Sequence, residues 1–185
     1  MNPVDALAAH ERAQAAFGAV LATINADHLG ASTPCSEWTV GELIEHVFGG
    51  NELAARGIGL YDEPPPRPDN LLDAHRATAE AAQRAFASPG AMDATIELPI
   101  GPVPARFFLP MRSIDALTHA WDLAVATGQS TDLDPELAAE QLTVARQLVQ
   151  PEFRGPGRPF AQEQSCAPDR SPADQLAAFL GRQVD

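Results

Sequence analysis

Two residues that could bind a cation stand four positions apart in an apolar stretch of the sequence. Asp115 and His119 lie in the run 107–127, whose composition is typical of a buried helix. Residues four apart lie one above the other on a helix face, so both side chains would project in the same direction, with Asp122 one turn further on. Because the rest of the run is apolar, these carboxylates need a partner once the helix is buried.

That partner could be a side chain or a metal ion. Arg112, or His119 as a cation, would neutralise Asp115 within the helix. A divalent ion would do so too if a facing helix supplied a further ligand, and helical bundles hold such sites. His46 is the natural candidate, since it lies at the inner edge of another predicted helix, although it could instead bond to water or Glu42.

The set His46, Asp115 and His119 would leave at least one metal position for water or a substrate atom, as in catalytic sites. Two imidazoles and a carboxylate suit several divalent ions. We expect zinc, and nickel, iron and manganese accept the same donors. The spacing assigns no catalytic or cofactor-binding residue. It leaves open whether Asp122 orients a ligand, and it favours a packing role for Cys35.

The elements that must position these residues are mostly helices. Thr39 and Glu42 form a capping box that marks the start of the helix carrying His46, and Asn70 is a good cap for the next helix. The sequence around 95–105 changes to an extended, proline-broken pattern. Periodicity and caps predict helices over 3–24, from 39 onward, and over 70–87, 107–127, 134–149 and 171–180. The predicted fold is all-α: a four-helix bundle with a short β-hairpin or extended segment before the fourth helix and small C-terminal helices.

Length and charge exclude several classes of protein. A chain of 185 residues fits one domain, which we place at 1–185. With 12 basic and 25 acidic side chains, its net charge of -13 disfavours nucleic acids and anionic membranes as partners. Two distant cysteines, no leader-like N-terminal pattern and no long apolar run predict a reduced, cytoplasmic protein. Three further histidines, His10, His28 and His75, are expected to be solvated.

Two segments of the chain resemble signature stretches of a known family. Residues 32–47, with the sequence STPCSEWTVGELIEHV, and residues 115–128, with the sequence DALTHAWDLAVATG, are similar to the mycothiol-dependent maleylpyruvate isomerase-like proteins of the DinB-like helical-bundle superfamily. Residues 98–104 and 172–182 also resemble an actinobacterial subgroup of metal-binding proteins. The resemblance implies a DinB-like bundle in which His46, Asp115 and His119 hold the metal ion.

The resemblance also suggests a reaction. A small thiol such as mycothiol would coordinate the open metal position as a cosubstrate, so the expected function is a metal-assisted thiol-dependent transferase or isomerase acting on a small molecule. The family's isomerase has Glu where this chain has Asp115, and it carries a C-terminal domain that this chain mostly lacks, so its substrate does not transfer. Two alternatives stay open: a non-catalytic metal or small-ligand binding bundle, and a purely structural bundle. The oligomeric state is also open, a homodimer included.

Overall fold

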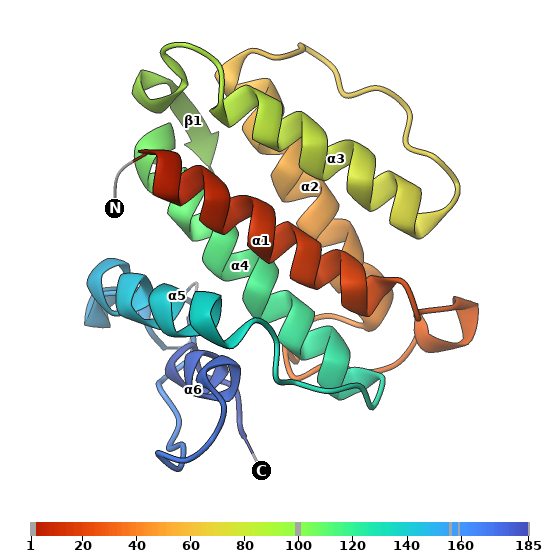
Figure 1. Ribbon diagram of the computed structural model, residues 1–185, viewed down its shortest axis with the longest axis vertical. Helices are drawn as coiled ribbons and strands as arrows, with labels where there is room; N and C mark the ends of the chain where they lie inside the picture. The colour runs from red at the N-terminus through yellow and green to blue at the C-terminus, as the bar shows by residue number, and fades with distance from the viewer. Residues whose placement is uncertain (1–2, 99–100, 156, 159, 185) are drawn as a thin grey trace.

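The computed structural model describes residues 3–98, 101–155, 157–158 and 160–184. Six α-helices and one β-hairpin make up most of the described chain (Figure 1). The elements are α1 (Pro3–Leu21), α2 (Val40–Ile58), α3 (Leu71–Phe86), β1 (Thr95–Leu98), β2 (Gly101–Pro104), α4 (Ala105–Ala126), α5 (Pro135–Leu148) and α6 (Pro172–Phe179), with short 3-10 turns between some of them. The predicted all-α bundle with a hairpin before its fourth helix is confirmed.

Local signals set the ends of the helices. The Thr39 side chain accepts from the backbone N–H of Glu42, and the Glu42 carboxylate accepts from the backbone N–H of Thr39 at 2.8 Å, so the predicted capping box starts α2. Asn70 caps α3 through its side-chain oxygen in the same way. Gly128 follows α4 with φ of 68°, a left-handed conformation that glycine adopts without steric cost.

The four long helices pack in two pairs, with α1 lying along α4 and α3 along α2 (Figure 1). Phe17, Leu43, Ile44, Phe48 and Leu123 fill the space between them and are almost fully buried. Helices α5 and α6 pack on each other and share a second apolar cluster with α1 and α4. The C-terminal helices therefore enlarge the core of the bundle. The prediction that 1–185 forms one domain stays a prediction.

The hairpin closes one end of the bundle. Strands β1 and β2 pair antiparallel, with Ile96 opposite Val103. Ile96 is fully buried and packs close to Gly57 of α2, where a Cβ atom would lie 3.1 Å from it. The prolines of this segment are tolerated because a two-stranded sheet has an unpaired edge on each strand. No helix among the described residues is both long enough and apolar enough to span a membrane.

A network of neutral polar side chains crosses the middle of the bundle. Gln14 of α1 bonds to Asn51 of α2 through both amide groups and also contacts His10 and His75, and His10 in turn bonds to Gln83. His10 is 0% and His75 4% exposed, so the expectation that these two are solvated is wrong. Both side chains lie on the inner side of their helices. A polar side chain is stable there only when another group forms a hydrogen bond with it.

Protonation of these two histidines should destabilise the fold. Burial lowers the pKa of both imidazoles from 6.5 to about 4. Between those values the unfolded chain binds protons that the folded chain does not, so the free energy of unfolding should fall as the pH drops from about 6.5 to about 4, by at most about 3 kcal/mol for each residue. Urea denaturation followed by circular dichroism at several pH values measures this.

Matched variants separate this effect from the titration of carboxylates. His75→Gln removes one buried imidazole and should show a smaller decline over the same pH range. His28 lies in a short turn where its ring accepts from the backbone N–H of Asn25, and His28→Gln should decline like the parent protein. An equal decline in all three proteins would contradict the assignment.

Candidate metal centre

The structure brings together the three residues predicted to bind a metal ion. His46 lies in the first half of α2, and Asp115 and His119 lie in α4, which packs against α2. The Oδ1 atom of Asp115 is 3.1 Å from Nε2 of His46 and 3.4 Å from Nε2 of His119. One carboxylate oxygen therefore lies between two imidazole nitrogens that come from different helices.

The second oxygen of Asp115 is held by Arg112. The guanidinium donates to Oδ2 at 2.8 Å from one turn earlier in α4. Burial alone would raise the pKa of the Asp115 carboxyl, but the charge of Arg112 and the contacts with His119 and His46 hold that pKa well below its usual range. Asp115 is therefore an anion at neutral pH, as a metal ligand must be.

A buried carboxylate fixes the orientation of His119. Its Nδ1 lies 2.9 Å from Oδ2 of Asp122, which is fully buried, and Arg182 from the chain after α6 donates to both oxygens of that carboxylate. Burial would raise the pKa of Asp122, but the bond to His119 and the charge of Arg182 lower it. An ionised Asp122 accepts a hydrogen bond from the protonated Nδ1 of His119, and the other ring nitrogen, Nε2, then faces Asp115.

The imidazole of His119 is also affected by its two acidic neighbours. Burial by itself would lower its pKa, but Asp115 and Asp122 together raise it. Without an ion, a protonated His119 satisfies both carboxylates, which is the ion pair foreseen as an alternative to a metal. A cation that binds to Nε2 of His119 would displace the proton that this nitrogen carries.

Trp38 covers one side of the centre. Its ring stacks on His46 with centroids 4.3 Å apart and lies at 5.5 Å from the ring of His119. The side chains of His46 and Asp115 remain 33% and 26% exposed. The centre is therefore closed toward the core and reachable from solvent beside His46.

Gly50 makes room for the guanidinium of Arg112 between α4 and α2. One nitrogen of Arg112 bonds to the Val47 carbonyl at 3.1 Å and approaches the Asn51 side chain at 3.5 Å. A Cβ atom at Gly50 would lie 2.3 Å from the guanidinium carbon, closer than any side chain allows. The absence of a side chain at this position thus permits the contact that holds Asp115.

Cys35 lies beside the same centre. Its sulfur, a ring nitrogen of His119 and an oxygen of Asp122 lie within 4.8 Å of one another. Burial raises the pKa of the Cys35 thiol, so it is protonated at neutral pH. It packs against the apolar cluster of α1, α2 and α4, as the sequence favoured.

Two of the three separations between donor atoms are those expected around a small divalent cation. Ligands about 2.0 to 2.1 Å from a tetrahedral ion lie about 3.3 Å from one another. The separations of 3.1 and 3.4 Å around Oδ1 match that value, and all three donors lie within 4.8 Å of each other. That these residues bind a metal stays a prediction at this point.

Sequence reasoning missed several residues that shape the centre. Arg112 was foreseen as a partner of Asp115, but its bond to the backbone of α2 was not. Nothing in the sequence linked Arg182 with Asp122, because 60 positions separate them and the sequence does not show where the chain after α6 meets α4. The sequence also did not link Trp38 with His46, because their stacking depends on how the loop before α2 folds back.

Known proteins similar to this chain share this architecture. Residues 10–124 match the family model of the mycothiol maleylpyruvate isomerase N-terminal domain. Two uncharacterized proteins of Mycobacterium tuberculosis, one from each of two strains, are 61% identical over 98% of this chain and all of their own length. A crystal structure of the mycothiol-dependent maleylpyruvate isomerase superposes with a TM-score of 0.58 at 21% identity, covering 77% of this chain and 68% of that one. A histidine-to-alanine mutant of the isomerase superposes with a TM-score of 0.60.

Adjacent glycines offer a test of the Arg112 contact. Gly50→Ala should lower the free energy of unfolding by about 2 to 3 kcal/mol, because its Cβ displaces the guanidinium and leaves buried charge unpaired. Gly49 has open space around its Cβ position, so Gly49→Ala should be neutral or stabilise by up to about 1 kcal/mol. Urea denaturation compares the two, and equal effects would contradict the structural account.

Proposed function

The chain belongs to the family of the mycothiol maleylpyruvate isomerase N-terminal domain, and we propose that it is a divalent-metal-binding enzyme that uses a small thiol in a transferase or isomerase reaction. The observation that carries the proposal is the placement of Asp115 Oδ1 between the Nε2 atoms of His46 and His119, at a position that solvent reaches. In a purely structural metal site, protein ligands usually fill every coordination position, so that no side is left open to solvent.

His46, Asp115 and His119 would hold the ion as three protein ligands. We propose zinc, because its usual tetrahedral site combines nitrogen and oxygen donors and keeps a fourth position open in enzymes. Nickel, iron and manganese are the alternatives with the same donors. A bound ion would lower the pKa of a coordinated thiol such as mycothiol, so that a thiolate is available near neutral pH.

The chain's own residues would prepare that site. Asp122 holds His119 in the tautomer whose Nε2 faces Asp115 and would be free to bind the ion, and Arg182 keeps Asp122 ionised. Arg112 holds one oxygen of Asp115, which leaves the other oxygen for the ion. Trp38 fixes the ring plane of His46 by stacking and shields that side of the centre from water. We assign no catalytic residue.

The substrate is a small molecule of a class that these contacts do not specify. About a third of the solved isomerase lies outside the superposition, and in this chain Arg182 and the C-terminal helices occupy the flank of the centre. We treat 1–185 as one domain. The proposal includes a cytoplasmic location and a homodimer as one candidate oligomeric state.

Metal analysis tests the first half of this function. Protein purified without a histidine tag and reloaded with Zn²⁺ or Co²⁺ should bind about one ion per chain, and His46→Ala, Asp115→Ala or His119→Ala should each weaken binding by at least about tenfold. Isothermal titration calorimetry and mass spectrometry of the metal content measure this. His28→Ala is the matched control, since His28 lies in a turn outside the centre, and it should bind like the parent.

Loss of binding in the control alone, or equal binding by all variants, would contradict the metal site. In that case the ion pairs of Asp115 with Arg112 and His119 explain the cluster by themselves, and the chain is a structural bundle.

Thiol binding tests the second half. Adding mycothiol to the cobalt-loaded protein should produce a thiolate-to-cobalt charge-transfer band, because the open position takes the sulfur as a thiolate. Mycothiol methylated on sulfur is the matched control and should leave the spectrum unchanged. An unchanged spectrum at saturating mycothiol would support the alternative function instead, a metal-binding bundle without thiol chemistry.

A further inference from the structure

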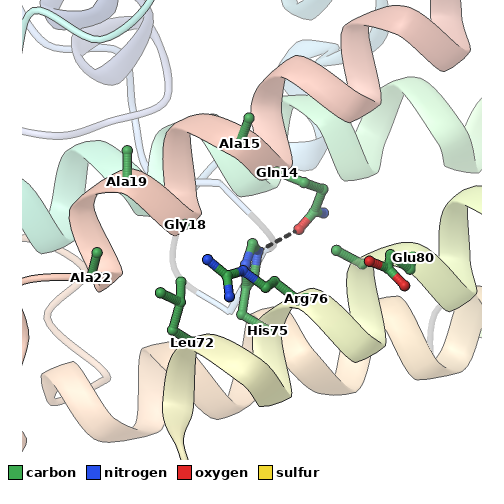
Figure 2. A pocket seen from close by; sticks show the side chains of 10 residues that line it. Gln14, Ala15, Gly18, Ala19, Ala22, Leu72, His75, Arg76 and Glu80 are labelled. Atoms are coloured by element: carbon green, nitrogen blue, oxygen red, sulfur yellow. Dashed lines mark hydrogen bonds between the residues drawn. The ribbon is translucent and has the colours of Figure 1, made fainter.

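A cavity of about 420 Å³ lies between α1 and α3, away from the metal centre (Figure 2). The cavity is a groove open to solvent. Its walls are mostly apolar, with the exposed Ala15, Ala19 and Ala22 from α1 and Leu72 and Ala79 from α3, and Arg76 and Glu80 stand at its rim. This volume falls within the range of about 300 to 1,000 Å³ that is common for small-molecule sites. The cavity is large enough for one small organic molecule.

His75 forms the polar floor of this cavity. Figure 2 shows its ring between the two helices, joined by a hydrogen bond to Gln14. Gly18 lines the cavity over the other edge of the ring, where a Cβ atom would lie 3.1 Å from Nδ1 and 3.2 Å from Cε1. Because glycine has no side chain, this edge of the imidazole is open to the cavity.

The hydrogen-bond network determines which nitrogen of His75 carries a proton. The Oε1 atom of Gln14 accepts from the Asn51 amide at 3.2 Å and lies 3.0 Å from Nε2 of His75. A carbonyl oxygen can only accept, so Nε2 of His75 must donate. Burial lowers the pKa of His75 to about 4, so the ring is neutral and Nδ1 is left as a bare acceptor.

The rest of the network agrees with this assignment. The Gln14 amide nitrogen donates to Asn51 at 3.0 Å and to Nε2 of His10 at 3.3 Å, so Nδ1 of His10 carries the proton that Gln83 accepts at 2.7 Å. Every ring nitrogen of this pair then has a matched partner except Nδ1 of His75, which has none among the described residues. His75 as a whole is 4% exposed, but its Nδ1 is not sealed from solvent, so this acceptor can be reached from the cavity.

We propose that this cavity binds a small, uncharged, largely apolar molecule with one hydroxyl group, of which phenol is the simplest example, and that the hydroxyl donates to Nδ1 of His75. The apolar walls would cover the body of the molecule. The rim carries one positive and one negative side chain, Arg76 and Glu80, both on the exposed surface of α3. Their opposite charges give the rim no net preference for a charged ligand.

A pair of probes tests the role of the hydroxyl. Phenol and anisole have the same ring, but anisole replaces the O–H donor with a methyl ether. Phenol should bind at millimolar concentrations, and anisole at least about tenfold more weakly, because one hydrogen bond to Nδ1 of His75 is lost. In protein with ¹⁵N-labelled histidine, phenol should shift the Nδ1 resonance of His75 to lower frequency and leave its Nε2 resonance nearly unchanged.

Glycine variants test the location. Gly18→Ala places a methyl group over Nδ1 and should weaken phenol binding at least about tenfold, whereas Gly49→Ala on α2 should leave it within about twofold. Thermal unfolding of both variants checks that each is folded. Equal binding of phenol and anisole, no binding of either, or unchanged binding to Gly18→Ala would overturn the proposal. None of these measurements depends on whether a metal is bound.

Discussion

The guanidinium of Arg112 joins α4 to α2, and the geometry of the metal centre depends on that contact. It bonds to the Val47 carbonyl on one helix and to the Asp115 carboxylate on the other. A buried cation that loses its acceptors costs several kcal/mol, so the two helices are held at a fixed distance. Gly50 permits the approach, because any side chain there would occupy the guanidinium position. Arg112 therefore holds Asp115 through an ion pair and the helix that carries His46 through a hydrogen bond.

Two groups of buried polar residues meet at Asn51, and they respond to burial in opposite ways. Around the metal centre the partners of His119 are carboxylates, which raise its pKa against the effect of burial. Around His10 and His75 the partners are neutral amides, so burial dominates and lowers the pKa of both. The first group is prepared to hold a cation, while the second keeps its imidazoles uncharged and available as hydrogen-bond acceptors.

The C-terminal part of the chain contributes to the centre although it lies beyond the residues that match the family model. Arg182 neutralises Asp122, which is fully buried and would otherwise be an unpaired charge. Trp121 donates to Asp174 at 2.7 Å, which anchors α6 against α4 two residues after His119. The apolar cluster shared by α1, α4, α5 and α6 supports both contacts. The orientation of His119, a proposed metal ligand on α4, is thus coupled to the packing of the last helix.

The helices and the candidate ligands could be predicted without a structure, because they depend on local signals: the caps at Thr39 and Asn70, and the four-residue spacing of Asp115 and His119. Which side chains meet across helices depends on how the helices pack. Periodicity gives the buried face of a helix but not its rotation and offset against a neighbour, so it could not show that Arg182 reaches Asp122. For the same reason His75 was expected in solvent: its partner Gln14 lies 61 positions earlier, and a buried imidazole is predictable only when the group that satisfies it is known.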